Sequence, residues 1–229
     1  MAVSEGIREA LDRVRERIER ACVRAGRASS EISLIAVSKA HPEEAVRAAY
    51  DAGLRVFGEN YAQELAHKAS VLEDLDIRWR FIGHLQRNKI KLIERARATV
   101  DTVDSARLAE AISSRAVANH IEVELLLQVN VGGEAQKSGC APAEVPALVA
   151  AVRALPNVEL RGLMTVAPHY DDPDDARPAF AALRELAATH ALPELSMGMT
   201  HDLEAAVQEG ATMLRIGTAL FGPRPDVVR

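Results

Sequence analysis

Short apolar runs alternate with amphipathic segments along almost the whole chain. The runs are rich in Val, Ile and Leu with little polar alternation, a pattern typical of parallel strands that are buried on both faces. They predict strands over residues 33–38, 55–58, 80–84, 99–103, 123–130, 158–166, 194–199 and 213–217. Between the strands, helical patterns begin near Glu43, Asn60, Gln86, Ser105, Ala143, Asp174 and His201, and a short helix is expected to open at Thr218.

A longer amphipathic segment precedes the first strand. Apolar residues recur there in steps of three and four, which predicts one buried stripe on a helix. The stripe consists of Ile7, Leu11, Val14, Ile18 and Cys22. Ser4 is the candidate N-cap of this helix, and Gly26 is its expected end.

These elements predict an α/β fold. Eight strand–helix repeats within roughly 200 residues favour a single (β/α)₈ barrel, a small TIM barrel, with an extra N-terminal helix. An open doubly wound sheet is the alternative, but no glycine-rich dinucleotide-binding turn follows the first strand. Since no linker or shift in composition divides the chain, residues 1–229 are expected to form one domain.

Composition and charge narrow the function classes. The chain carries 33 acidic and 28 basic side chains, a net charge of −5, whereas a nucleic-acid-binding domain is expected to be basic. No apolar stretch has the length of a signal-peptide core or of a membrane span. Cys22 and Cys140 show no metal-binding spacing and suggest no disulfide framework. We therefore expect a cytoplasmic protein that binds neither nucleic acid nor membrane.

The segment LIAVSKAHPEEA (residues 34–45) places a lysine, Lys39, at the end of the first predicted strand. In (β/α)₈ barrels the carboxyl ends of the strands carry the chemistry. Because side chains alternate along a strand, Lys39 shares a face with Val37 and Ile35 and is expected at the mouth, on the interior side. A partly desolvated lysine is more often neutral and can form a Schiff base with an aldehyde. The alternative is a lysine whose ammonium group reaches water.

Lys39 differs in context from the other four lysines. It is the one with a predicted strand behind it. Lys68, Lys89 and Lys91 fall in charged helical patterns, and Lys137 falls in a glycine-flanked loop.

Small and hydroxyl-bearing residues follow the last two predicted strands. SMGMTHD (residues 196–202) and RIGTALFG (residues 215–222) each lead into a helix, where backbone N–H groups and the helix dipole attract an anion. Phosphate sites in such barrels are commonly built from the loops after strands 7 and 8, although each segment alone could equally be a helix cap. Because closure places the last strand beside the first, this site would adjoin Lys39. Pyridoxal 5′-phosphate (PLP) carries both an aldehyde and a phosphate.

Several motifs resemble those of one known family. AVSK with HP, FGENYAQE, FIGHLQRNK, LRGLMT, LSMGMTHDLEAA and MLRIGTALFG occur in the order found in the pyridoxal phosphate homeostasis protein family. The resemblance covers residues from about 5 to 223. It implies a monomeric barrel similar to that of alanine racemase, which is fold type III among PLP proteins.

The resemblance also implies roles for individual residues. Lys39 matches the lysine that holds the cofactor covalently, and Arg215 matches the arginine beside the pyridine nitrogen. The phosphate-binding positions are matched by Ser196, Thr200, Gly217 and Thr218, and positions lining the cofactor by Asn60 and Met164. The alternative for Arg215 is a structural ion pair inside the barrel. No clear role is implied for His84, and the acidic segment 167–178 is either a surface turn or a flap over the barrel mouth.

Two functions remain open at this stage. One is a non-catalytic protein that buffers PLP or delivers it to PLP-dependent apo-enzymes, and so maintains vitamin B6 and amino-acid homeostasis. The other is an amino-acid racemase of the alanine racemase type, which needs an acid–base group on each face of the substrate. In alanine racemase a tyrosine of a second domain serves one face; Tyr61 and Tyr170 are the candidates here. An arginine beside the ring nitrogen makes the ring a poorer electron sink, so we favour the non-catalytic carrier.

Overall fold

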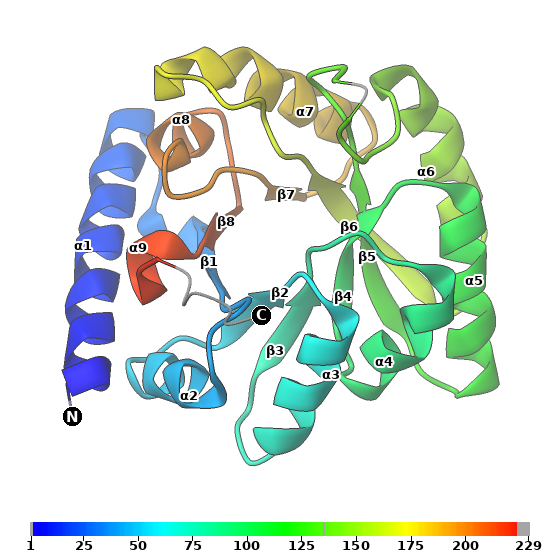
Figure 1. The fold of residues 1–229 in the computed structure, drawn as a ribbon. Coiled ribbons are helices and arrows are strands. Elements are labelled where there is room, and N and C mark those ends of the chain that lie inside the picture. The colour runs from blue at the N-terminus through cyan, green and yellow to red at the C-terminus, as the bar shows by residue number, and fades with distance from the viewer. Residues whose placement is uncertain (1, 135, 224–229) are drawn as a thin grey trace.

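The computed structural model describes residues 2–134 and 136–223. Within these ranges eight parallel strands close into one barrel, and they follow chain order until β8 meets β1 (Figure 1). The strands are β1 (Ser33–Val37), β2 (Val56–Glu59), β3 (Arg78–Phe81), β4 (Thr99–Val103), β5 (Val123–Gln128), β6 (Val158–Met164), β7 (Glu194–Ser196) and β8 (Met213–Ile216). The predicted (β/α)₈ barrel is confirmed, and each predicted strand overlaps an observed one.

Helices surround the barrel (Figure 1). They are α1 (Ala2–Ala25), α2 (Glu43–Asp51), α3 (Ala62–Val71), α4 (Ile90–Arg95), α5 (Ala106–Ala118), α6 (Val145–Arg153), α7 (Arg177–Thr189), α8 (Leu203–Gln208) and α9 (Thr218–Phe221). Short 3₁₀ turns occur at Ser29–Glu31, Arg87–Lys89, Pro142–Glu144 and Pro173–Ala176. The last of these lies in the acidic segment 167–178, which therefore leads into α7 through a turn. None of the described helices is long and apolar enough to pass through a bilayer.

The extra N-terminal helix is present, but it begins earlier than predicted. α1 already includes Ala2, so the assignment of Ser4 as its N-cap was wrong. Alanine is the strongest helix former, and neither Gly nor Pro interrupts residues 2 and 3, so the helix extends past Ser4. The predicted stripe from Ile7 to Cys22 is buried as expected, and α1 lies along α8 and α9 (Figure 1).

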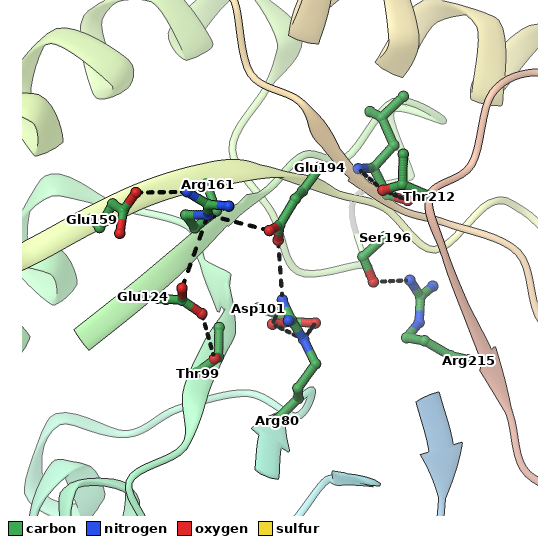
Figure 2. A network of polar contacts seen from close by, with 11 residues as sticks. Arg80, Thr99, Asp101, Glu124, Glu159, Arg161, Glu194, Ser196, Thr212 and Arg215 are labelled. Atoms are coloured by element: carbon green, nitrogen blue, oxygen red, sulfur yellow. Dashed lines mark hydrogen bonds and ion pairs between the residues drawn. The ribbon is translucent and has the colours of Figure 1, made fainter. Parts of the chain in front are cut away.

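Side chains inside the barrel form a mixed apolar and polar filling. The apolar part consists of Ile35, Val56, Leu126, Met164 and Met213. The polar part includes Arg80, Asp101, Ser196 and Arg215, all buried (Figure 2). Because strand side chains alternate, the opposite face packs on the helices in the main core. The predicted inward face of the first strand is confirmed at Ile35.

Closure of the barrel places β8, the last strand, beside β1, the first. Ile35 lies opposite Arg215 and Ala36 opposite Ile216 in the pairing of β1 with β8. One step further, a Cβ atom added to Gly217 would lie 3.3 Å from the carbonyl oxygen of Val37. The end of β1 and the segment after β8 therefore meet at the same rim of the barrel.

Candidate functional site

Lys39 lies in a tight turn at the carboxyl end of β1. The strand ends at Val37, so Lys39 lies two residues beyond it, and the side chain is half-buried. The backbone N–H of His41 donates to the carbonyl of Ser38 at 3.0 Å, which closes the turn, and the Ser38 N–H donates to Gly58 on β2 at 3.2 Å. The lysine is thus presented at the barrel mouth by a turn that is fixed at both sides.

The turn that carries Lys39 packs against the segment after β8. The imidazole of His41 contacts the ring of Phe221 on α9, with 5.1 Å between the ring centroids. α9 begins at Thr218, directly after Gly217. The structure therefore brings the Lys39 turn beside two of the predicted phosphate-binding residues, although these lie about 180 residues away along the chain.

The segment after β7 forms a second compact turn. Gly198 has a φ of +89°, and a Cβ atom added there would lie 2.4 Å from the Cβ of Ala206 on α8. Only glycine fits this position. The backbone N–H of Met199 donates to Asp202 at 2.6 Å, and Thr200, half-buried, lies within the same turn. This backbone is therefore held close to α8.

Arg215 projects from β8 into the barrel and contacts residues at the ends of β6 and β7. Its guanidinium donates to the Ser196 hydroxyl at 2.9 Å (Figure 2) and to the carbonyl of Thr165 at 2.7 Å. Burial lowers the pKa of Arg215 to about 10, with Asp101 and Asp202 acting in the opposite direction. The side chain remains a cation at neutral pH. Because Ser196 accepts from it, the hydroxyl proton of Ser196 is still available for donation.

Asn60 and Met164, the predicted lining residues, lie at the ends of their strands. Met164 is the last residue of β6 and belongs to the apolar filling of the barrel. Asn60 directly follows β2, and its Oδ1 atom is buried without a hydrogen-bond partner among the described residues. A Cβ atom on Gly83 would come within 2.0 Å of the Asn60 carbonyl oxygen, so the glycine lets two loops touch. The adjacent His84 is exposed.

The N-terminal helix holds the turn after β7 from outside. Arg17 of α1 donates to Glu204 of α8 through Nε and Nη2, each at 2.7 Å. The same Nη2 atom donates to the carbonyl of Thr200 at 2.9 Å. Nothing local in the sequence distinguishes Arg17 from the other arginines of α1.

A buried ion pair inside the barrel was also missed from the sequence. Arg80 on β3 donates through Nε to both carboxylate oxygens of Asp101 on β4, at 3.0 Å each (Figure 2). Burial raises the pKa of Asp101, which Arg80 opposes. Glu194 on β7 lies 3.7 Å from Arg80 and links it to Arg161. The signal that could have revealed this network is a charged residue inside a strand predicted to be buried on both faces.

A second missed group surrounds the Lys39 turn. Lys68 lies on α3, as its charged helical pattern predicted, but its side chain is only 2% exposed. Lys68 contacts both Glu59 and Glu64. The Glu64–Lys68 spacing of four residues was visible in the sequence, but such pairs are usually solvated. Only the packing of α3 on β2 buries this one.

The class of protein follows from the fold and this rim. Residues 10–225 match the family described as alanine racemase, N-terminal domain. Alanine racemase from Corynebacterium glutamicum superposes with a TM-score of 0.69 at 20% identity, over 100% of this chain and 62% of that one, which shows a shared fold. The chain is a barrel protein of the alanine racemase N-terminal type.

More similar proteins narrow the assignment. A pyridoxal phosphate homeostasis protein of Aquifex aeolicus is 46% identical over an alignment of 222 residues, which covers 94% of this chain and 97% of the relative. The structure of PipY from Synechococcus elongatus with PLP bound has a TM-score of 0.81 at 36% identity and covers 94% of this chain and 100% of that one. The chain belongs to the pyridoxal phosphate homeostasis protein family, as its motifs implied.

Proposed function

We propose that this chain is a non-catalytic PLP-binding protein, which holds the cofactor reversibly through Lys39 and buffers or delivers it. The observation that supports this most directly is the contact between the Lys39 turn and the segment after β8. An amine and the segment that we propose to bind the phosphate thereby lie together at the carboxyl end of one barrel. The names of its relatives, which are homeostasis proteins, support the same role.

The roles that we propose follow from the contacts of each residue. When bound, PLP supplies an aldehyde for covalent attachment and a ring that can withdraw electrons. Ser196 has a hydroxyl proton to donate to the phosphate. The remaining phosphate-binding residues in this proposal are Thr200, Gly217 and Thr218. Met164 offers an apolar surface to the ring, and the unpartnered Oδ1 of Asn60 can accept a hydrogen bond from the cofactor.

Arg215 argues against strong carbanion chemistry at this site. A guanidinium has only donors, so beside the ring nitrogen it would favour the unprotonated ring. Asp101 acts to raise the pKa of Arg215 and also pairs with Arg80 at 2.8 Å, so it helps to keep the Arg215 guanidinium charged. Tyr61, one candidate for a second acid–base group, is 62% exposed. These features favour a carrier over a racemase.

We further propose that the protein acts as a cytoplasmic monomer that passes PLP to PLP-dependent apo-enzymes. Its net charge of −5 supports the expectation that it binds neither nucleic acid nor membrane. Light scattering of the PLP-loaded protein is expected to give the mass of one chain, 24.8 kDa. A dimer mass would contradict this part of the proposal.

Replacing the attachment residue tests the central claim. Lys39→Ala is expected to abolish the near-visible absorbance band of the PLP-loaded protein, because no other amine is proposed to form the covalent bond. Borohydride reduction followed by peptide mass spectrometry should locate the label on Lys39 in the unchanged protein. Lys91→Ala, which removes an exposed lysine on α4, is the matched control and should keep the band. An unchanged spectrum in Lys39→Ala would overturn the assignment.

The racemase alternative is tested separately. Incubation of the PLP-loaded protein with L-alanine, followed by chiral chromatography, is expected to give no more D-alanine than free PLP does. Turnover at rates typical of enzymes, about 1 s⁻¹ or faster, would replace the carrier with an enzyme.

A further inference from the structure

A buried cluster of charges lies directly behind the Lys39 turn. The ammonium group of Lys68, on α3, is surrounded by three oxygen acceptors, each at 2.7 Å. They are the carbonyl oxygen of Ser38, Oε1 of Glu59 and Oε1 of Glu64. An ammonium has three protons to donate, so these acceptors account for all of them.

The cluster holds the backbone on both sides of Lys39. On one side, Lys68 binds the Ser38 carbonyl, and the Ser38 hydroxyl donates to Glu59 at 2.7 Å. On the other side, the backbone N–H of Ala40 donates to Glu64 at 2.7 Å. The peptide groups that flank Lys39 are therefore fixed by one connected set of charge-assisted hydrogen bonds.

Ala40 shows that this turn needs such support. Its φ of +63° lies in the left-handed region, which is unfavourable for a residue with a Cβ atom. Among the described residues the other non-glycine positions with positive φ follow helices, namely Arg97, His120, Asn157 and Ala191. Ala40 follows a strand instead, and a strained conformation of this kind persists only when surrounding contacts impose it.

Stability alone does not account for the cluster. Glu59 is fully buried, and burial raises the pKa of its carboxyl group, although Lys68 acts to lower it. Its second oxygen, Oε2, is buried without a hydrogen-bond partner among the described residues. Buried ion pairs are often no more stabilising than apolar residues of the same volume. A cluster with an unsatisfied oxygen is thus better explained by the geometry that it imposes on its neighbours.

We propose that Lys68 and Glu64 are positioning residues that fix the Lys39 turn so that its amine meets the cofactor aldehyde. This inference rests on the proposed function, because it concerns the same attachment residue. Neither Lys68 nor Glu64 touches the cofactor in this proposal; both act through the peptide groups of Ser38 and Ala40.

The decisive variant is Glu64→Ala, because the Glu64 side chain is 22% exposed and its loss should leave the fold intact. PLP affinity is expected to fall about tenfold or more, since the Ala40 N–H and Lys68 each lose a charge-assisted hydrogen bond. Pyridoxine 5′-phosphate, which carries an alcohol in place of the aldehyde, should bind with unchanged affinity. Glu64→Gln keeps the oxygen acceptor and is expected to restore most of the PLP affinity.

A matched control separates positioning from general stability. Glu94 on α4 is 14% exposed and accepts from Arg115 at 2.7 Å, at the opposite end of the barrel from Lys39. Glu94→Ala should lower the melting temperature about as much as Glu64→Ala does. It should leave the affinities for PLP and for pyridoxine 5′-phosphate unchanged. Lys68→Met is the second variant, and if it folds it should show the same selective loss of PLP binding as Glu64→Ala.

Three outcomes would overturn the inference. These are an unchanged PLP affinity in Glu64→Ala, an equal loss of PLP and pyridoxine 5′-phosphate affinity, and an equal loss of PLP affinity in Glu94→Ala. Each leaves the proposed function standing as long as the unchanged protein still attaches PLP at Lys39. If the unchanged protein does not attach PLP there, the proposed function itself fails.

Discussion

Several charged residues of this barrel are buried inside strands, where the hydrophobic pattern predicts apolar side chains. Arg215 is the main example: it is buried, it remains cationic, and it is held by Ser196 and the Thr165 carbonyl. Ser196 therefore has two tasks in our interpretation. It partners a buried cation, and it offers its own proton to a phosphate.

The double task of Ser196 leads to a test at the residue scale. Ser196→Ala leaves a buried guanidinium donor unpaired, which is expected to lower the free energy of unfolding by about 1–3 kcal/mol. PLP affinity should fall about tenfold, while the affinity for pyridoxal, which has no phosphate, should stay the same. Urea unfolding and a binding titration measure the two effects.

Thr212 supplies the control for this variant. Its hydroxyl accepts from the backbone N–H of Leu195 at 2.8 Å, at the start of the same strand pair. Thr212→Val removes a hydroxyl that precedes β8 and does not contact Arg215, so it should reduce stability without changing PLP affinity. If Ser196→Ala weakened pyridoxal and PLP binding alike, the phosphate role of Ser196 would be excluded.

At the scale of elements, α1 is more than a cover for the barrel. Through Arg17 it holds both α8 and the Thr200 carbonyl. The apolar stripe explains why α1 packs on the barrel. The contact of α1 with the turn after β7 explains how the helix could influence ligand binding. We expect the position of this turn to depend on α1.

The Arg17–Glu204 contact should make that dependence sensitive to pH. Burial alone would raise the pKa of Glu204, but hydrogen bonds from Arg17 outweigh it and hold the pKa below the ordinary 4.5. A carboxyl group with a depressed folded pKa adds stability above its unfolded pKa and loses it as the pH falls through the folded pKa. Arg17→Met is therefore expected to lower the melting temperature at pH 7, and this difference should shrink below pH 4.5.

The control for Arg17→Met is a variant that removes a charge from α1 at a residue without a contact to α8. Among the described residues, Arg13 forms only an exposed ion pair, with Glu9 at 3.8 Å, so Arg13→Met should have little effect at either pH. Arg17→Met should also weaken the binding of PLP and pyridoxine 5′-phosphate equally, since the turn after β7 is proposed to hold the phosphate. A difference in melting temperature that stayed constant from pH 7 to pH 3 would show that Glu204 is not responsible.

At the scale of the whole molecule, the strands place charges from distant segments in one enclosed interior. Arg80 and Asp101 come from neighbouring strands, while Glu194 reaches them from across the barrel (Figure 2). We propose that residues 1–229 form a single domain around this interior. Urea unfolding followed by tryptophan fluorescence and by circular dichroism should then give coincident, single transitions.

A double-mutant cycle on the buried pair tests how strongly the interior is coupled. Arg80→Met and Asp101→Leu are each expected to cost about 3–5 kcal/mol, because each leaves a buried charge unpaired, and the double variant should cost less than the sum. The exposed pair Arg47–Asp74 is the control and should show little coupling. Strictly additive effects at Arg80 and Asp101 would mean that the two charges do not depend on each other.

Much of the fold could be predicted because it depends on local patterns. Residues 34–37, for example, are apolar on both faces, which suits a strand that is covered on both sides. The ends of the strands were predicted less accurately than their presence. β7 has three residues where six were predicted, because Gly198 adopts a positive φ that ends the strand. Lys39 was predicted as a site residue because a lysine directly after a predicted buried strand is unusual.

The sequence by itself determined the barrel and the stripe of α1, and it predicted Lys39 and the segments after β7 and β8 as residues of the candidate site. These features depend on hydrophobic periodicity and on motifs, and both are properties of residues that lie close together in the sequence. Only the tertiary structure decided that Lys68 is buried, that Arg17 reaches Thr200 and that Arg80 pairs with Asp101. The physical reason is that a charged side chain has the same local pattern whether it faces water or an opposite charge. Its surroundings are fixed by segments far away in the chain.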